Sequence, residues 1–451
     1  MTTTIPKPSR PKTKKRSTVR HTRAIQRDRT KRPISMPIDE QVSEHLTQII
    51  HPATLAQVAH FHELGLRERL LSLPVMVALV LTMLWRQLAS VGELVRLLRC
   101  EGFLWCSPVQ VTQQALSERL RTFPAALFLR VLQDLLPQMQ GRAEARKRPL
   151  PPALAWARAR YEQVLAVDGS TLDALLRKVG LLRDLPTNPL AGRMTALLDL
   201  CSRLPRHVWF EADPQAHDQR FWPRIQQVLS PGTLLLFDLG YTNFGVFAQL
   251  SAAHVTWLTR AKSNLAYTLE RPLVQTDSLQ DALVWIGSGA ECQQVRLVQV
   301  LVGRTWYRYL TNELNPVILP APYLAAVYAQ RWRIEEAYAL VKRLLGLAYF
   351  FVGSENGVQL QLFATWLLYA VLVDLTDAVA ESLDAPLAAL SLEMVYRSIY
   401  YFSQAFHRGE AQEPVVYLAQ NARWLGILKR KRKRDDSNLP ALPLLTNPAG
   451  A

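Results

Sequence analysis

Three short apolar segments follow one another in the middle of the chain before any helical segment intervenes, and this order restricts the fold more than any other feature. They are Tyr161 to Asp168 (YEQVLAVD), Arg193 to Cys201 (RMTALLDLC) and His207 to Ala212 (HVWFEA). Each is bounded by Gly, Pro or charged residues, a pattern typical of β-strands. The sequence therefore predicts three successive strands.

Helical and extended patterns alternate after these strands. Asp218 to Leu229 has a helical pattern, whereas Thr233 to Asp238 (TLLLFD) and His254 to Arg260 (HVTWLTR) predict two more strands. Three strands before the first helix, followed by alternation, predict a mixed sheet whose buried centre is covered by helices. The fold class expected from this order is α/β.

The regions around this predicted sheet divide the chain further. Residues 264–318 are rich in strand patterns, including Gln293 to Val302 and Thr305 to Leu310, and we expect an insertion there. A long helix is predicted after Pro322, and a very apolar one over Gln359 to Leu375. The expected organisation is a disordered basic arm (1–35), an all-α N-terminal domain (36–150), a sheet domain in two parts (151–263 and 319–384) interrupted by the β-rich insertion (264–318), and C-terminal helices with a basic tail (385–451).

The positive charge of the chain is concentrated in two short regions. The 451 residues carry a formal charge of +16, of which residues 1–32 contribute +11 and the run Lys429 to Arg434 contributes +6. The remainder of the chain is left with −1, so the expected globular part is nearly neutral. Such extensions bind polyanions or acidic membrane surfaces.

Several classes of protein are disfavoured by the sequence. The four cysteines form no C-x-x-C pair and do not cluster with histidines, which argues against a disulfide scaffold or a zinc site and suits a reducing cytoplasm. Leu70 to Trp85 is apolar but too short to cross a membrane, so we expect a buried helix and no membrane association. The segments Ser90 to Arg99 and Thr112 to Arg121 predict two short helices, which leaves a DNA-reading helix-turn-helix and ordinary helix packing as alternatives.

Two aspartates end predicted strands and are candidates for a shared site. Asp168 is followed by Gly-Ser-Thr, and Asp238 is followed by Leu-Gly-Tyr. A carboxylate at the end of an apolar strand is costly to leave unpaired, and ligands bind at that edge of open sheets. Each aspartate alone is more often a turn former than a ligand, but together they suggest a shared divalent cation.

The predicted helix Tyr328 to Lys342 supplies the other polar groups. At 100° per residue, Arg331, Glu335 and Lys342 fall with Tyr328 on one arc of about 60°. Glu336 points elsewhere, and the apolar stripe is formed by Ile334, Ala337, Tyr338, Val341 and Leu345. The alternative is a solvated helix face carrying an Arg331–Glu335 ion pair.

The spacing Tyr, two residues, Arg, three residues, Glu, six residues, Lys resembles the Tyr-Arg-Glu-Lys signature of the insertion-sequence-four family of DDE transposases. Asp168 in VDGST resembles the first aspartate of that family, and Asp238 in FDLGY resembles the second. WLTRAK and GSENGVQLQLF are also similar to the family, whereas Leu239 stands where many relatives have Arg. The resemblance covers about half of the chain.

This resemblance implies an RNase H-like fold in which Asp168, Asp238 and Glu335 are catalytic and bind two Mg²⁺ ions, for which Mn²⁺ can substitute. It further implies that Arg331 and Lys342 hold DNA phosphates and that Tyr328 contacts the DNA backbone. Trp332 either stacks on an unpaired base or belongs to the core.

The function expected from this likeness is cut-and-paste transposition. Such an enzyme cleaves double-stranded DNA at the terminal inverted repeats of an insertion sequence and joins the ends to target DNA, as a homodimer on the DNA. A transposase derivative that binds DNA without cutting it, and a nuclease of the same fold without strand transfer, are the alternatives.

Overall fold

The computed structural model of the protein describes residues 40–429, apart from 68, 89, 173–191, 346, 348–350 and 352–353. The predicted basic arm (1–35) and residues 430–434 of the basic run lie outside the described residues.

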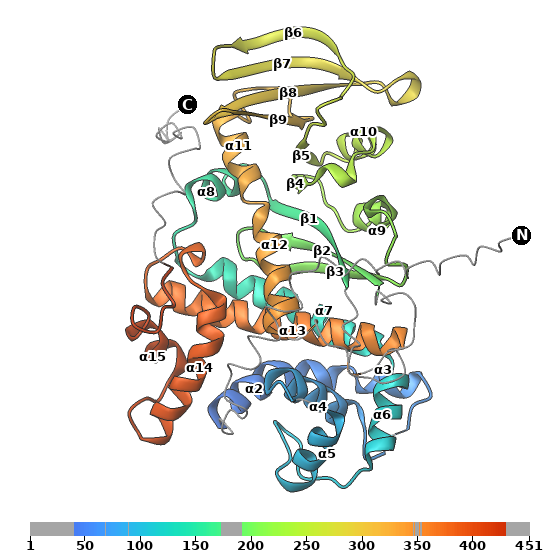
Figure 1. Cartoon of the computed structure of the whole chain (residues 1–451), viewed down its shortest axis with the longest axis vertical. Helices are drawn as coiled ribbons and strands as arrows, with labels where there is room; N and C mark the ends of the chain where they lie inside the picture. Colours follow the sequence, from blue (N-terminus) through green and yellow to red (C-terminus); the bar gives the residue numbers. More distant parts are fainter. Residues whose placement is uncertain are drawn as a thin grey trace, which may run out of the picture. The chain divides into compact units, whose positions relative to one another are not determined.

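One large sheet runs through the described part of the chain, with the strand order β3-β2-β1-β4-β5-β9-β8-β7-β6 (Figure 1). The strands are β1 (Gln163–Leu172), β2 (Gly192–Asp199), β3 (Pro205–Glu211), β4 (Thr233–Phe237), β5 (Thr256–Arg260), β6 (Thr268–Gln275), β7 (Leu279–Ile286), β8 (Gln293–Val302) and β9 (Thr305–Thr311).

The sheet is mixed, as predicted. β1 pairs antiparallel with β2, and β2 pairs antiparallel with β3, whereas β1, β4 and β5 are parallel to one another. Parallel neighbours need a crossover connection. The 3₁₀-helix η2 (Asp218–Phe221) and α9 (Trp222–Gln226) precede β4, and α10 (Phe244–Ala252) connects β4 to β5. The sequence pattern did not predict α10.

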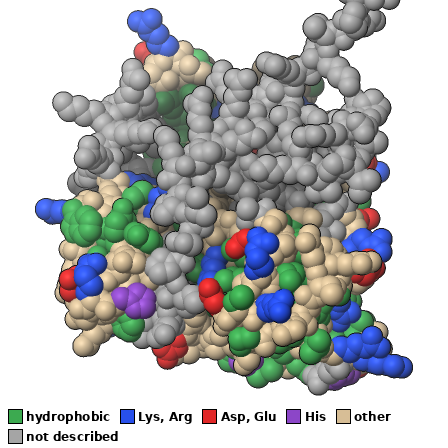
Figure 2. Space-filling model, turned by 60° about the horizontal axis from the view of Figure 1, so that its bottom comes forward, with side chains coloured by type: hydrophobic (Ala, Val, Ile, Leu, Met, Phe, Trp, Pro, Cys, Tyr) green, Lys and Arg blue, Asp and Glu red, His purple; other side chains and the backbone are tan. Residues whose placement is uncertain are grey.

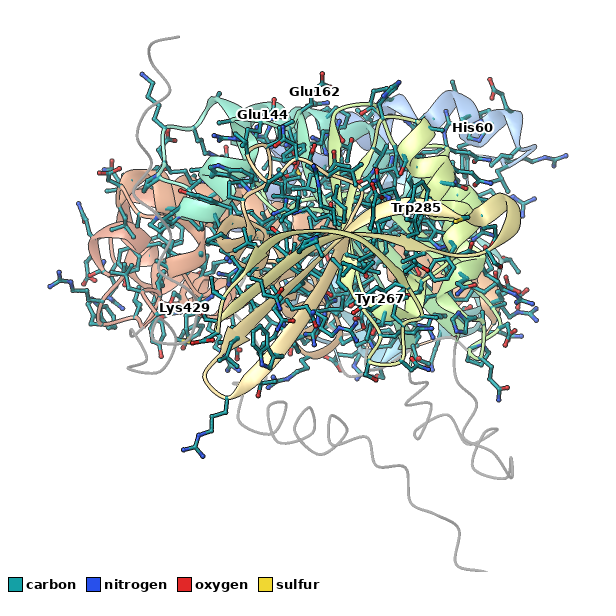
Figure 3. All side chains as sticks on the ribbon, turned by 90° about the horizontal axis from the view of Figure 1, so that it is seen from above. His60, Glu144, Glu162, Tyr267, Trp285 and Lys429 are labelled. Atoms are coloured by element: carbon teal, nitrogen blue, oxygen red, sulfur yellow. The ribbon has the colours of Figure 1, made fainter. Side chains whose placement is uncertain are left out.

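The strand-rich residues 264–318 extend the same sheet. β9 pairs antiparallel with β5 through Leu258 and Thr311, and β8, β7 and β6 follow outward. Tyr267 and Trp285 lie at the outer hairpin formed by β6 and β7 and are partly exposed (Figure 3). The insertion therefore lengthens the sheet at the edge away from β1.

Helices cover both faces of the central strands (Figure 1). On one face lie α11 (Ala321–Ala329), α12 (Trp332–Ala339), the π-helical turn η5 (Leu340–Leu344) and α13 (Glu355–Ser382). On the other face lie α9 and α10. Side chains alternate along a strand. In β1, Val164 and Ala166 accordingly join the core under α12, and Leu165 and Val167 join the core under α9 and α10.

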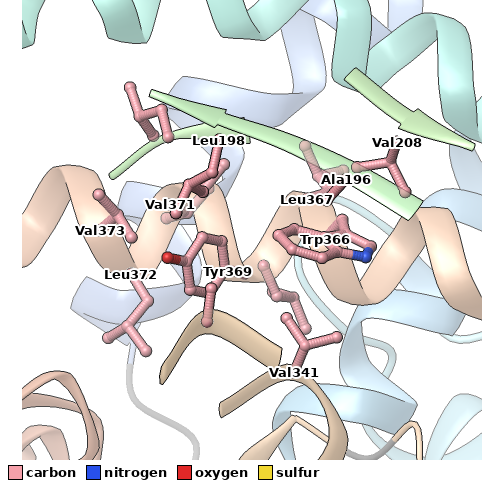
Figure 4. Packing of buried hydrophobic residues seen from close by; sticks show 14 of the residues in the cluster. Ala196, Leu198, Val208, Val341, Trp366, Leu367, Tyr369, Val371, Leu372 and Val373 are labelled. Carbon is pink, nitrogen blue, oxygen red and sulfur yellow. The ribbon is translucent and has the colours of Figure 1, made fainter. Parts of the chain in front are cut away.

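The predicted apolar helix after residue 359 is α13, and it is a core element. Trp366 and Leu367 lie beside Ala196 and Val208 of β2 and β3 (Figure 4), and the ring of Tyr369 contacts that of Trp366. Among the described helices, α13 alone is long and apolar enough to cross a membrane, but 94% of its most apolar window is buried inside the protein.

Seven helices of the described residues precede the sheet. They are α2 (Glu40–Ala56), α3 (Val58–Glu63), α4 (Leu73–Trp85), α5 (Val91–Cys100), α6 (Gln113–Thr122), α7 (Ala125–Ala145) and α8 (Pro152–Arg158). Most of α4 is buried, as predicted for this apolar segment. Ser90 Oγ accepts a hydrogen bond from Glu93 N at the start of α5, which confirms the expected cap.

The segment between α5 and α6 does not have the form of a helix-turn-helix. Residues 101–112 separate the two helices, and Phe103 and Cys106 form a β-bridge within them. A helix-turn-helix has a turn of about three or four residues. The structure therefore favours the alternative of ordinary helix packing.

The basic stretch at the end of α7 is neutralised by acidic residues of α13. Arg142 Nη2 lies 2.8 Å from Asp374 Oδ2, Arg146 Nη1 lies 3.0 Å from Asp377 Oδ2, and Arg148 also pairs with Asp377. The two aspartates are almost fully buried. These arginines therefore connect α7 and the residues that follow it to α13.

Two helices follow α13, namely α14 (Leu392–His407) and α15 (Pro414–Gln420). On the face shown in Figure 2, the described Lys and Arg side chains are interspersed with Asp and Glu. This distribution agrees with the nearly neutral charge of the chain between its two basic extensions.

Candidate functional site

Asp168 and Asp238 lie side by side where the parallel pairing of β1 with β4 ends. β1 itself continues to Leu172 through its pairing with β2, so the prediction that Asp168 ends its strand is wrong. The parallel ladder of β1 and β4 ends with the pair Val167 and Phe237, and each aspartate is the next residue. By strand alternation, Asp168 continues the row of Ala166, and Asp238 continues the corresponding row of β4, both facing α12. Adjacent strands are about 4.8 Å apart. Both carboxylates therefore leave the same edge of the sheet on the same face.

Arg331 and Glu335 reach this edge from the junction of α11 and α12. Arg331 Nη1 donates to Asp168 Oδ2 at 3.2 Å, and Arg331 Nη2 donates to Glu335 Oε1 at 2.8 Å. Arg331 is only 5% exposed, whereas Glu335 is more than one-third exposed. One guanidinium thus joins the first predicted aspartate to the predicted glutamate.

The charges of the predicted acidic residues act on one another. Burial raises the pKa of Asp168 to about 6, opposed by Arg331 and by the Gly169 N–H, and the negative charges of Glu335 and Asp238 raise it further. Burial disfavours the charged form of Arg331. Its pKa is nevertheless raised overall by the nearby Tyr328, Asp168 and Asp238 and by the hydrogen bond with Glu335. Asp168, Asp238 and Glu335 therefore share one electrostatic environment centred on Arg331.

The side chains are not arranged as a metal site in this structure. Among the described residues, no group of three or more His, Cys, Asp or Glu side chains is placed so that it could hold a metal ion. The guanidinium of Arg331 occupies hydrogen-bonding positions on two of the three carboxylates. The donor set itself consists of carboxylate oxygens, which fits Mg²⁺ or Mn²⁺. A metal ion that took these two oxygens would have to displace Arg331 from Asp168 Oδ2 and Glu335 Oε1.

Lys342 contacts the continuation of β1 beyond Asp168. Its Nζ donates to Ser170 Oγ at 2.7 Å and to the Thr171 carbonyl at 2.5 Å. The helix that carries Lys342 is not one regular α-helix, because α11 ends at Ala329 and the π-helical η5 begins at Leu340. The assumption of 100° per residue from Tyr328 to Lys342 is therefore wrong. The predicted apolar stripe, including Ile334 and Val341, is nonetheless buried.

Tyr328 and Trp332 have opposite environments. Tyr328 is 5% exposed, and its hydroxyl donates to the carbonyl of Phe237, the residue before Asp238, at 3.3 Å. This contact suits the positioning of β4 better than a contact with DNA. Trp332 is 60% exposed, with Arg331 Cζ 5.6 Å from the centre of its ring. The alternative that Trp332 belongs to the core is wrong.

Three residues that contact β1 or the turn after β4 near the two aspartates were not predicted from the sequence. The Tyr338 hydroxyl donates to the Asp168 carbonyl and accepts from Ala196 N, so it fixes β1 against β2. Tyr338 was assigned only to the apolar stripe of its helix. Asp218 and Arg193 form an ion pair on the other face of the sheet. The glycines that follow both aspartates were the available signal, since glycine allows close approach of another group.

Comparison with known proteins relates this site to one family. Residues 187–371 match the transposase DDE domain, a range that includes Asp238 and Glu335 and begins after Asp168. The chain is 30% identical over 152 residues to y4zB of Sinorhizobium fredii, named as a transposase, over 32% of this chain and 43% of that protein. It is 24% identical over 177 residues to a protein of Geobacillus stearothermophilus named as the transposase of insertion sequence element IS5377, over 38% and 46% of the two chains.

These matches cover less than half of either relative. Among solved structures, the piggyBac transposase synaptic complex with hairpin DNA has a TM-score of 0.42 at 11% identity, over 89% of this chain and 88% of that one. That likeness is too weak to support a conclusion. The sequence matches show that residues 187–371 are similar to a transposase DDE domain and that parts of the chain are similar to two proteins named as transposases, one of them of an insertion sequence.

Proposed function

We propose that this chain is a cut-and-paste DNA transposase of the insertion-sequence-four type. The observation that carries the proposal is the meeting of Asp168, Asp238 and Glu335 around Arg331, where the parallel ladder of β1 and β4 ends, within a chain that matches a DDE domain. Residues far apart in the sequence supply this acidic site. Tyr328, Arg331, Glu335 and Lys342 are the proposed signature residues.

The strand order supports an RNase H-like catalytic domain. Three antiparallel strands (β3, β2, β1) are followed on the other side of β1 by the parallel strands β4 and β5. In this proposal residues 36–150 form the N-terminal domain, residues 151–263 and 319–384 form the catalytic domain, and residues 264–318 are its insertion. Residues 385–451 follow as C-terminal helices and tail.

The proposed cofactor is a pair of Mg²⁺ ions held by Asp168, Asp238 and Glu335. When bound, such ions supply Lewis acidity at the scissile phosphate. The chain itself contributes positioning. Released from the carboxylates, the Arg331 guanidinium can form a fork on a phosphate, and Lys342 supplies a point charge beside β1. The exposed Trp332 offers a surface on which an unpaired base can stack.

The proposed partners are double-stranded DNA at terminal inverted repeats, target DNA and a second copy of the chain. The basic arm and the basic run suit this proposal because they supply most of the positive charge of a chain that is otherwise nearly neutral. Two element ends must be joined, so we expect a homodimer on DNA. A cytoplasmic, nucleoid-associated location is part of the same proposal.

The direct test compares Glu335→Gln with Glu393→Gln. Glu393 forms an i,i+4 pair with Arg397 at 2.7 Å, as Glu335 does with Arg331 at 2.8 Å, but it lies on α14. A plasmid that carries the DNA flanking the gene is incubated with each variant and Mg²⁺. We expect Glu335→Gln to abolish cleavage and Glu393→Gln to cleave like the wild type. Equal activity of all three proteins would refute the proposal.

The Arg331 contacts also favour a second candidate, a transposase derivative that binds DNA without cutting it. In that protein the guanidinium would remain on Asp168 and Glu335, and divalent ions would not bind. Isothermal titration of the full chain with Mn²⁺ separates the two candidates. A nuclease without strand transfer would bind Mn²⁺ and cleave, but would yield no joined product.

A further inference from the structure

An ion pair lies behind the candidate site, on the face of the sheet opposite α12. Asp218 is the first residue of η2, and Arg193 belongs to β2, where it pairs with Thr171 of β1. Arg193 Nη2 donates to Asp218 Oδ1, and both side chains are less than one-fifth exposed. In β1, Gly169 has the same orientation as Val167, so its missing side chain would point toward this pair.

The carboxylate of Asp218 fits between the two glycines that follow the predicted metal ligands. A Cβ added to Gly169 would lie 2.1 Å from Asp218 Oδ1, and one added to Gly240 would lie 2.8 Å from Asp218 Oδ2. The first distance is too short for any side chain. Gly169 follows Asp168 directly, and Gly240 lies two residues after Asp238. One carboxylate therefore lies against β1 just after Asp168 and against the turn just after Asp238.

Neighbouring residues hold the same segment against the turn after β4. Gln219 Nε2 donates to the Thr242 carbonyl at 2.8 Å, and Trp222 Nε1 donates to the Tyr241 carbonyl at 3.1 Å. Trp222 is almost fully buried. The position of Asp218 is thus fixed by its own ion pair with Arg193 and by the contacts of the residues that follow it, so it can act as a spacer.

We propose that the Asp218–Arg193 ion pair is a positioning element that sets the separation of Asp168 and Asp238. The inference rests on the proposed function, because the separation matters only if the two carboxylates share metal ions. Asp218 supports the backbone from the rear face while the carboxylates project from the front face. Residues that orient metal ligands from behind affect metal affinity by about 10- to 100-fold when mutated.

The first test is the affinity of the full chain for Mn²⁺, measured by isothermal titration. We expect Asp218→Asn, which keeps the shape but removes the charge, to bind Mn²⁺ about 10- to 100-fold more weakly than the wild type. The matched control is Asp213→Asn. Asp213 pairs with Arg220 at 3.1 Å in the same connection, but both side chains are exposed, and we expect no change.

Arg193→Gln separates positioning from direct ligation. If the ion pair positions the strands, Arg193→Gln weakens Mn²⁺ binding as Asp218→Asn does. If Asp218 were itself a ligand, removal of its competing cation would leave the affinity unchanged or increase it. The second result would overturn the inference, as would wild-type affinity in Asp218→Asn.

A stability measurement tests the spacer without metal. Gly169→Ala should lower the Tm by about 2–4 °C because of the clash with Asp218. Asp218→Ala introduced into Gly169→Ala should recover part of this loss, whereas additive losses would overturn the inference. The proposed function fails differently. A wild-type chain that bound no Mn²⁺ would refute the metal site. The non-additive effect of Gly169→Ala and Asp218→Ala on the Tm would still show whether the ion pair positions β1 and the turn after β4.

Discussion

The guanidinium of Arg331 donates a hydrogen bond to the carboxylate of Asp168, at 3.2 Å, across 163 residues of sequence. The same guanidinium binds Glu335, so a protein cation occupies the place where a metal ion is expected. This relationship makes Arg331 a competitor of the metal as well as a candidate phosphate ligand, and the two roles can be separated by experiment.

Arg331→Ala should lower the Tm of the metal-free protein, because the carboxylates lose their shared counter-charge. It should also strengthen Mn²⁺ binding by about tenfold, the factor that corresponds to about 1.4 kcal/mol of competing ion-pair energy. Titration calorimetry and thermal unfolding with and without Mn²⁺ measure both effects. Arg397→Ala, which breaks the equivalent pair on α14, is the control. An unchanged Mn²⁺ affinity would show that Arg331 does not compete.

Metal binding should depend on pH through Asp168. Burial raises the pKa of this carboxyl to about 6 from an ordinary value of 3.8, so the folded protein holds a proton there between these pH values. The proton favours the folded metal-free state, and this contribution is lost as the pH rises through 6. Because a metal ligand must be ionised, Mn²⁺ affinity should rise about tenfold per pH unit below pH 6 and level off above it. A flat affinity from pH 5 to 7 would contradict this.

Asp377→Ala should destabilise the fold without reducing DNA affinity. Asp377 is 1% exposed and pairs with Arg146 and Arg148, so its removal leaves Arg148 charged and buried. Breaking one partner of a buried pair costs about 3–5 kcal/mol. Urea unfolding measures the loss, and Glu410→Ala, in an exposed pair with Arg408, should leave the urea midpoint unchanged. Reduced DNA binding in folded Asp377→Ala would contradict the structural role of this network.

Trp332→Ala should weaken binding to DNA ends with unpaired bases while leaving stability unchanged. Stacking of a base on an aromatic ring contributes about 1–3 kcal/mol. Trp332 is exposed, so its replacement removes little packing. Fluorescence anisotropy with fully paired and partly unpaired duplexes measures the difference. Trp424→Ala, at an equally exposed position, is the control. An equal loss for both duplexes would argue against stacking.

The local patterns predicted the elements that local forces decide. The strands of residues 293–302 and 305–311 and the cap at Ser90 were found within a residue or two, because alternation and capping depend on neighbouring residues. The helix α10 was missed, although its N-cap Asn243 accepts a hydrogen bond from Val246 N. The regular helix predicted from Tyr328 to Lys342 was wrong, because the helix is interrupted between Ala329 and Trp332 and becomes π-helical at η5.

The sequence by itself determined which residues could carry the chemistry. Two aspartates followed by glycine motifs at strand ends, and a helix with Arg and Glu four residues apart, were visible from spacing and periodicity alone. The expected domain boundaries and roles in DNA binding remain predictions.

Only the tertiary structure decided how these groups meet. It buried Tyr328 against β4, exposed Trp332, joined the insertion to the sheet and placed Asp218 behind Gly169 and Gly240. The physical reason is that these residues are tens or hundreds of positions apart in the sequence. Whether they meet depends on which faces of the helices and strands pack against one another. Local propensity fixes which side of an element is apolar, but not which neighbour covers it.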